Sequence, residues 1–272
     1  RRPVPADERR GAMTRIFVVD AFAEAPFAGN PAAVVPDAAG LSDVAMRDIA
    51  AEMNLSETAF LTEANGAYRL RWFSPVHEVA FCGHATIATA HVLSADLGLS
   101  GPFIFETRVG ALRVETSADG LVLEVPRLDP EPVPTPPAII DEAFGADPVA
   151  VFRNFENLFV RLADDAAVRA ADPPLARLAE LFPLGVCITA PGREADFVSR
   201  YFAPGAGIPE DPVTGSTHAT LAPYWAAELG RTRLDARQLS RRGGALRCDV
   251  GSDTVRIEGR AVTVMDGLLR AP

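Results

Sequence analysis

The sequence predicts an α+β fold with two similar lobes, and three observations support this. A strand–loop–helix construction occurs twice, at residues 71–97 and 201–229. Around the two copies, short apolar blocks and alternating segments indicate many strands and few helices. Residues 126–137 contain six prolines, and neither a helix nor a central strand tolerates such a segment. We therefore expect a linker there, between a lobe at 14–125 and a lobe at 138–272.

The repeated construction consists of a strand, Phe-x-Pro, a glutamate, and a glycine followed by an apolar helix. In the first copy the defining residues are Phe73, Pro75, Glu78, Gly83 and His84, and their counterparts are Phe202, Pro204, Glu210, Gly215 and Ser216. The step from glutamate to glycine is five residues in both copies, but the spacing from proline to glycine differs by three. A second register, which aligns 84–86 with 218–220, also remains open. Two copies predict two lobes, with a helix N-terminus from each at a shared cleft.

In the first lobe, residues 1–13 are rich in arginine and proline and are expected to form a flexible arm. The apolar pattern predicts strands at 15–22, 32–35, 58–62, 68–73 and 103–106, and a hairpin at 112–125. Ser42 or Asp43 can cap a helix that ends at Met53. One face of this helix consists of Val44, Ile49, Ala50 and Met53. A second helix is expected from about 85 to 97, before Gly98.

In the second lobe, a similar order of elements is expected. The pattern predicts strands at 157–162, 185–189 and 197–202, then a hairpin of 245–249 with 255–258 and a final strand at 261–265. Helices are expected near 139–144, 175–181 and 216–229. Pro223 should kink the last of these unless it lies in the first turn, because proline has no N–H to donate.

Composition excludes several classes of protein. The net charge of −10 makes nucleic acid an unsuitable partner, since phosphate binding requires a basic face. No apolar run approaches the ~20 residues of a membrane span, and the first residues lack the apolar segment of a signal peptide. Three widely spaced cysteines indicate a reducing compartment rather than a disulfide framework. We therefore expect a cytoplasmic protein with no membrane partner.

The absence of lysine excludes several classes of enzyme mechanism. All 26 basic residues are arginines. A lysine forms the Schiff base of pyridoxal-phosphate enzymes and class I aldolases, and a lysine contacts phosphates in P-loop enzymes. None of these mechanisms is available to this chain, so any proton transfer next to an amino group would proceed without pyridoxal phosphate.

The two helix N-termini are suited to binding an anion. Unpaired backbone N–H groups and the positive end of the helix dipole favour a group such as a carboxylate. Gly83 and Gly215 would let the backbone approach that group closely. The alternative is that both glycines simply make tight turns between a strand and a helix.

Four motifs give the chain its resemblance to a known family. They are FAGNPAAVV at 27–35, NLSETAFL at 54–61, FSPVHEVAFCGHAT at 73–86 and FAPGAGIPEDPVTGS at 202–216. Together they resemble the PhzF-like isomerases, relatives of diaminopimelate epimerase, from Arg15 to about Leu269. The resemblance implies two diaminopimelate epimerase-like lobes, each a curved, mostly antiparallel sheet around a central helix. It also implies that the last strand returns to the first lobe, and homodimers are common in the family.

The resemblance assigns roles to individual residues. It implies that Glu57 is the general acid and base, which is physically credible because a carboxyl group in an apolar cleft holds its proton near neutral pH. It implies that His84, Asp211 and Ser216 orient and polarise the substrate. Asn30 and Gly29 would lie in a loop near the site. The alternatives are a surface position at a strand edge for Glu57, a helix-capping or core role for His84, capping by Asp211 or Ser216, and a plain turn at 29–30.

Cys82 and possible metal ligands form a separate question. In the related epimerases one cysteine at each helix start acts as a base, and Cys82 stands at the first of these positions. The second copy of the construction contains no cysteine, so inversion by two thiols is excluded. Cys82 could act with Asp211, or it could be a small buried side chain. The spacing of His77, Glu78 and His84 matches no metal motif, and we expect no metal.

We therefore predict a cofactor-independent isomerase that acts on a small, unsaturated, amino-acid-like carboxylate. Glu57 would move a proton between two carbons, and the substrate would be held by Asn30, Gly83, His84, Asp211, Gly215 and Ser216. One alternative is an amino-acid epimerase or racemase, which needs a second base opposite Glu57. Another is a ligand-binding protein that keeps the fold and has lost catalysis.

Overall fold

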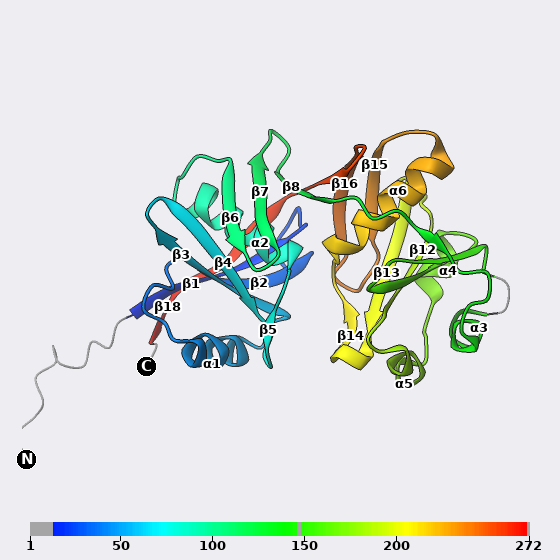
Figure 1. The fold of residues 1–272 in the computed structure, drawn as a ribbon, viewed down its shortest axis with the longest axis horizontal. Coiled ribbons are helices and arrows are strands. Elements are labelled where there is room, and N and C mark those ends of the chain that lie inside the picture. Colours follow the sequence, from blue (N-terminus) through cyan, green and yellow to red (C-terminus); the bar gives the residue numbers. More distant parts are fainter. Residues whose placement is uncertain (1–12, 146–147, 271–272) are drawn as a thin grey trace, which may run out of the picture.

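The computed structural model describes residues 13–145 and 148–270, which form two lobes side by side (Figure 1). Strands dominate both lobes, and each has one central helix. The predicted α+β fold of two repeated lobes is confirmed. The expected arm at 1–13 lies outside the described residues except for Met13, which begins the first strand.

The strands of the first half lie close to their predicted positions. They are β1 (Met13–Ala21), β2 (Asn30–Val35), β3 (Glu57–Ala64), β4 (Ala67–Phe73), β5 (Glu78–Val79), β6 (Phe103–Thr107), β7 (Gly110–Thr116) and β8 (Leu121–Pro126). The strands that follow are β9 (Glu131–Pro132), β10 (Ala150–Arg153), β11 (Asn157–Arg161), β12 (Gly185–Pro191), β13 (Phe197–Ala203), β14 (Ile208–Asp211), β15 (Arg233–Gln238), β16 (Gly244–Val250), β17 (Thr254–Gly259) and β18 (Ala261–Arg270).

The pairing of the strands repeats between the halves. The first series is β18–β1–β2–β3–β4–β6–β7–β8, and the second is β9–β10–β11–β12–β13–β15–β16–β17. In each series the third and fourth strands pair in parallel, as do the fifth and sixth, and the others are antiparallel. β8 pairs with β17 and joins the series into one sheet. The final strand, β18, lies along β1.

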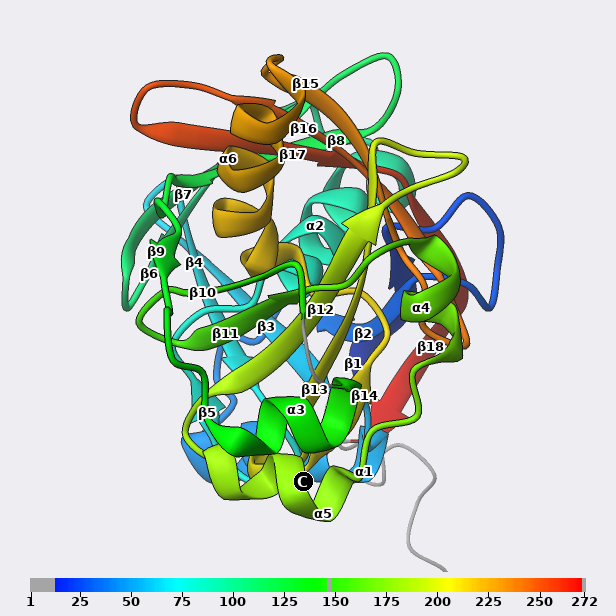
Figure 2. The same ribbon diagram turned by 90° about the vertical axis from the view of Figure 1, so that its right-hand side faces the viewer.

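The helices occupy two kinds of position. α2 (Gly83–His91) continues into a π-helical turn at Val92–Asp96, and α6 (His218–Leu229) follows a 3-10 turn at Gly215–Thr217. α2 contacts β1, β2, β3, β7 and β8, so the first sheet curves around it (Figure 2). The outer helices are α1 (Asp43–Met53), α3 (Ala138–Phe144), α4 (Asp165–Ala170) and α5 (Leu175–Leu178). None of the helices in the described part of the chain is long and apolar enough to cross a membrane.

Matching ion pairs identify the register of the repeat. In the first copy Arg71 binds Glu78 and lies over the ring of Phe73 at 5.0 Å. In the second copy Arg200 binds Glu210, and its guanidinium is 5.1 Å from the centre of the Phe202 ring. The strand and the glutamate of the two copies therefore align in the register that pairs Phe73 with Phe202. A three-residue 3-10 turn, Pro204–Ala206, accounts for the three extra residues of the second copy.

Apolar burial explains why the central helices form where they do. Eight of the nine residues of α2 are buried, and Trp225 of α6 is 1% exposed. In contrast, α1 buries one face only, against β1, β2 and β3. That face includes Ala45 and Met46, whereas Val44 is 59% exposed. The prediction that Val44 faces the core is wrong, because Val44 lies one residue, or about 100°, away from the buried stripe.

Pro223 is accommodated inside α6 by the linker. It is the sixth residue of the helix, which continues to Leu229. Proline cannot donate to the carbonyl four residues earlier, which is that of Ala219. The backbone N–H of Leu128 donates to this carbonyl instead, at 3.0 Å. The Pro-rich segment thus satisfies the acceptor that Pro223 leaves free, and the helix needs no break there.

Candidate active site

Four of the predicted residues meet where the lobes face one another. Asn30 and Glu57 begin the parallel strands β2 and β3, so both lie at the same edge of the first sheet. His84 is the second residue of α2, and Asp211 ends β14 in the second lobe. All four are buried or nearly so, and the side chain of Glu57 is 14% exposed. The fold therefore places residues that are up to 181 positions apart in sequence in one site.

A continuous line of contacts connects Glu57 to Asp211. Glu57 Oε2 lies 3.3 Å from His84 Nε2. His84 Nδ1 lies 3.3 Å from Asn30 Nδ2, which donates to Asp211 Oδ1 at 2.9 Å. Asn30 Nδ2 also donates to the carbonyl oxygen of Val213 at 2.9 Å. Asn30 is thus the residue that joins the first lobe to the second within the site.

The contacts assign the proton on His84. The two N–H groups of the Asn30 amide donate to Asp211 and Val213, and an amide nitrogen cannot accept a hydrogen bond. A proton on Nδ1 would therefore find no acceptor in Asn30, and we place the ring proton on Nε2. Nε2–H then donates to Glu57 Oε2. Within residues 13–145 and 148–270, the other oxygen of Glu57, Oε1, makes no hydrogen bond. Oε1 is therefore the atom available to a substrate.

Burial makes Glu57 a weak acid. Loss of water around the carboxyl group, reinforced by the nearby charge of Asp211, raises its pKa from 4.5 to about 7. Burial also lowers the pKa of His84 to about 3, so the imidazole is neutral. The two groups therefore form a hydrogen bond rather than an ion pair. At neutral pH Glu57 can both accept and release a proton, as a general acid and base requires.

Asp211 is held by donors from three elements. It accepts from Asn30 Nδ2 and from the hydroxyl of Thr214, and its backbone carbonyl accepts from Gln238 Nε2 at 2.8 Å. Burial raises the pKa of Asp211 to about 6, and the two side-chain hydrogen bonds oppose that rise. Asp211 does not cap α6, whose first turn has no side-chain cap. Its oxygens face the site instead.

Cys82 contacts the site directly. Its Sγ lies 3.6 Å from Glu57 Oε2 and 3.5 Å from His84 Nδ1. Burial and the neighbouring carboxyl groups raise the pKa of this thiol well above its ordinary value, so it is an S–H donor rather than a thiolate. The thiol hydrogen bond opposes the rise in the pKa of Glu57. Cys82 is therefore placed to orient the carboxyl group of Glu57.

The two helix starts face each other across the site. α2 contacts the turn at 215–217, and neither α2 nor α6 has a side-chain cap. A Cβ added to Gly215 would meet the ring of Phe22 at 3.3 Å, whereas one added to Gly83 would make ordinary contacts. Gly215 therefore makes room for Phe22. Ser216 is half-buried and makes no hydrogen bond within the part of the chain that the structure describes.

One group of possible metal ligands lies in the site. Atoms of Glu57, Cys82 and His84 lie within 4.8 Å of one another, which is close enough for one divalent cation. The sequence did not indicate this group, because Glu57 is 25 residues from Cys82. His77 and Glu78, the neighbours considered from sequence, bind Ser74 and Arg71 instead.

Three residues that sequence did not single out also shape the site. Thr214 and Gln238 hydrogen-bond to Asp211, and Phe22 packs against Gly215. Thr214 lies inside the motif at 202–216, where it could have been noticed. Phe22 has a positive φ of 59°, which a sequence does not reveal for a bulky residue. Gln238 ends a strand and belongs to no motif.

Comparison with known proteins identifies the family and the fold of the chain. A family model described as phenazine biosynthesis-like protein matches residues 19–267. The uncharacterised isomerase PA2770 of Pseudomonas aeruginosa is 49% identical over 255 residues, covering 93% of this chain and 98% of the relative. A crystal structure of a PhzF-family phenazine biosynthesis protein from Enterococcus faecalis has a TM-score of 0.90 at 40% identity, over 94% of this chain and 99% of that chain. The predicted epimerase PA4716 of P. aeruginosa shares the fold, with a TM-score of 0.71 at 24% identity, over 94% of this chain and 99% of that one.

Proposed function

The chain belongs to the phenazine biosynthesis-like family of isomerases, and from that membership we propose that it shifts a double bond by moving a proton. The substrate is a small, unsaturated, amino-acid-like carboxylate of secondary metabolism. No cofactor takes part. The observation that carries this proposal is the position of Glu57, whose raised pKa and free Oε1 suit it to both halves of a proton transfer.

The step requires only one titrating group. Oε1 of the Glu57 carboxylate takes a proton from a carbon next to the substrate carboxylate, and the electron pair of that C–H bond forms a new double bond. The old double bond opens at its far carbon, which receives the proton back from Glu57. Nothing is oxidised or reduced. The hydrogen bonds from His84 and Cys82 hold Oε2, so the carboxyl group keeps its orientation between the two steps.

The remaining groups bind and polarise the substrate. The uncapped N–H groups at the starts of α2 and the 215–217 turn favour the substrate carboxylate. Ser216 can donate its hydroxyl to the same group. Asp211, from the second lobe, accepts from the amino group. Buried polar groups of this kind bind strongly because little water competes with them.

Glu57→Gln tests the proposal. General acid–base catalysis contributes about 10²–10⁴-fold, so turnover should fall by about 10³-fold or more while ligand affinity is kept. Glu63→Gln, in the exposed part of the same strand, is the control. The assay mixes the protein with a panel of β,γ-unsaturated α-amino acids in D2O and follows double-bond migration by proton NMR. Near-normal turnover of Glu57→Gln would refute the assignment.

The second candidate is an amino-acid epimerase, and the position of Asp211 favours it. This carboxyl group, with its pKa of about 6, comes from the other lobe and could serve as the opposing base. An epimerase would incorporate solvent deuterium at one carbon with loss of optical purity and no double-bond migration. The same NMR assay separates the two reactions.

A further inference from the structure

The segment between β15 and β16, residues 238–243, hydrogen-bonds to both halves of the site. Toward the second lobe, Gln238 Nε2 donates to the Asp211 carbonyl at 2.8 Å, and its Oε1 accepts from the Thr214 N–H at 2.8 Å. Ser240 Oγ donates to the carbonyl of Pro212 at 2.7 Å. The segment thus fixes the strand end that carries Asp211.

Toward the first lobe, the same segment holds the loop that precedes Asn30. Arg242 Nε donates to the Gly29 carbonyl at 2.8 Å, and Nη2 donates to the Ala28 carbonyl at 2.9 Å and to Asp20 Oδ1 at 2.7 Å. The Gly243 carbonyl accepts from the Gly29 N–H at 2.8 Å. Both peptide groups of Gly29 are therefore bound by residues of the 238–243 segment.

The loop has little freedom to adopt another shape. Asp20, whose side chain is 2% exposed, accepts from the Phe27 N–H through its second oxygen at 2.6 Å. Gly29 has a φ of +62°, and a Cβ there would lie 2.1 Å from the Ala21 carbonyl oxygen. Arg242 and Asp20 thus hold both ends of a loop that ends at Asn30. A buried carboxylate paired with a guanidinium by several hydrogen bonds has a well-defined geometry.

We propose that Arg242 is a positioning residue of the active site: with Asp20, it fixes the loop carrying Asn30, and so the amide that joins His84 to Asp211. The proposal rests on the proposed function in taking this site as the active one. Arg242 makes none of its hydrogen bonds to Glu57, His84 or Asp211. Its effect therefore passes through Asn30.

Two readouts test this without a substrate. The first is the rate at which the Asn30 side-chain amide protons exchange with water, with their signal assigned by its loss in Asn30→Ala. The second is the titration midpoint of the Glu57 carboxyl carbon. In Arg242→Gln we expect the exchange to be at least tenfold faster and the midpoint to move down toward that of an ordinary glutamate, because water enters and Asp211 moves away. Asp20→Asn, a milder change, should give a smaller effect in the same direction.

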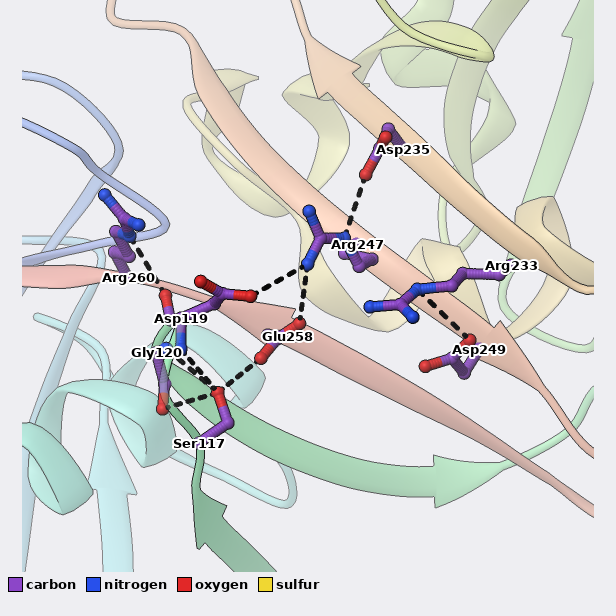
Figure 3. A network of polar contacts seen from close by, with 9 residues as sticks. All are labelled: Ser117, Asp119, Gly120, Arg233, Asp235, Arg247, Asp249, Glu258 and Arg260. Carbon is purple, nitrogen blue, oxygen red and sulfur yellow. Dashed lines mark hydrogen bonds and ion pairs between the residues drawn. The ribbon is translucent and has the colours of Figure 1, made fainter.

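Two arginines provide matched controls. Arg241 is exposed and makes no hydrogen bond or ion pair with the residues that the structure describes, so Arg241→Gln removes the adjacent charge alone. Arg247 also connects the lobes, through an ion pair to Asp119 at 3.3 Å, and it pairs within its own lobe with Asp235 and Glu258 at 3.1 and 3.4 Å (Figure 3). Arg247→Gln should lower the melting temperature and leave both readouts unchanged.

The outcomes separate the possibilities. If Arg242→Gln lowers the melting temperature and leaves both readouts as in the unchanged protein, Arg242 is structural only and the proposal is wrong. Equal changes in Arg247→Gln would also overturn it, because any loosening of the lobes would then suffice. If Glu57 titrates as an ordinary glutamate in the unchanged protein, the proposed function fails, and the exchange of the Asn30 amide still decides the role of Arg242.

Discussion

At the scale of single residues, Glu57 links catalysis to stability. Its pKa rises from 4.5 to about 7 when the chain folds, so the folded state binds this proton more tightly than the unfolded state. Between those two pH values the folded chain holds the proton and the unfolded chain releases it. Stability therefore falls as pH rises through this window, and the loss is complete above about pH 7.

Glu57→Gln should consequently stabilise the protein at high pH. The pKa difference corresponds to roughly 2–4 kcal/mol of unfolding free energy at pH 8, and to almost nothing at pH 4, where both side chains are neutral. Urea denaturation of both proteins at the two pH values measures this difference. Equal stability at pH 8 would mean that the carboxyl group is not buried as described.

Cys82 should assist catalysis without being essential. Its thiol donates to Glu57 Oε2 and opposes the rise in the pKa of that group. Cys82→Ala should therefore raise the pH at which turnover reaches half its maximum and lower the maximal rate by less than about tenfold, the value of roughly one such hydrogen bond. A pH profile of turnover checks both effects. A loss near that of Glu57→Gln would make the thiol a catalytic group.

The sequence predicted some residues of the site but not others. Asn30, Glu57, His84 and Asp211 lie in motifs, and the fold brings them together as expected. Arg242 could not be predicted, because an arginine between two strands carries no local signal. Its partners are backbone carbonyls more than 200 residues away. Only the tertiary structure reveals such contacts.

At the scale of elements, α6 depends on the linker. The Leu128 N–H donates to the Ala219 carbonyl, to which Pro223 has no N–H to donate. Leu128→Pro removes this donor and should destabilise the protein by about 1–3 kcal/mol, the usual effect of an unsatisfied buried carbonyl. Adding Pro223→Ala restores a donor within the helix and should recover about 1 kcal/mol.

Denaturant unfolding of the single and double variants measures the coupling free energy between Leu128→Pro and Pro223→Ala. Leu128→Ala keeps the N–H and loses the side chain, so it should show no coupling to Pro223→Ala. Strictly additive effects of Leu128→Pro and Pro223→Ala would contradict the shared carbonyl.

The elements that sequence missed were short or weakly apolar. β10, β14 and α4 have four to six residues each, too few for a periodic signal. β15 buries alternate residues, but one of the three buried residues is the polar Gln238, and the three exposed residues are all charged. Longer apolar strands such as β1 and β12 were predicted to within three residues. The apolar pattern of these strands was sufficient to predict that they lie in the core.

At the scale of the whole molecule, the repeat produces one site from two unequal halves. The strand pairing is the same in both halves, yet β3 carries Glu57 and β12, which has the same place in the order, carries no acidic residue. The sequence predicted two lobes but not the β8–β17 pairing that joins them, because pairing between distant strands leaves no local pattern. This asymmetry favours a reaction that uses one proton-transferring residue.

Proton transfer by Glu57 depends on its sharing one water-poor site between the lobes with Asp211. The most direct test is the titration of the Glu57 carboxyl carbon by NMR in protein with ¹³C-labelled glutamate, its signal assigned by its loss in Glu57→Gln. We expect a midpoint near pH 7, and a lower midpoint in Asp211→Asn, because the charge of Asp211 contributes to the raised pKa. A midpoint near 4.5, or one that Asp211→Asn leaves unchanged, would show that the two carboxyl groups do not share such a site.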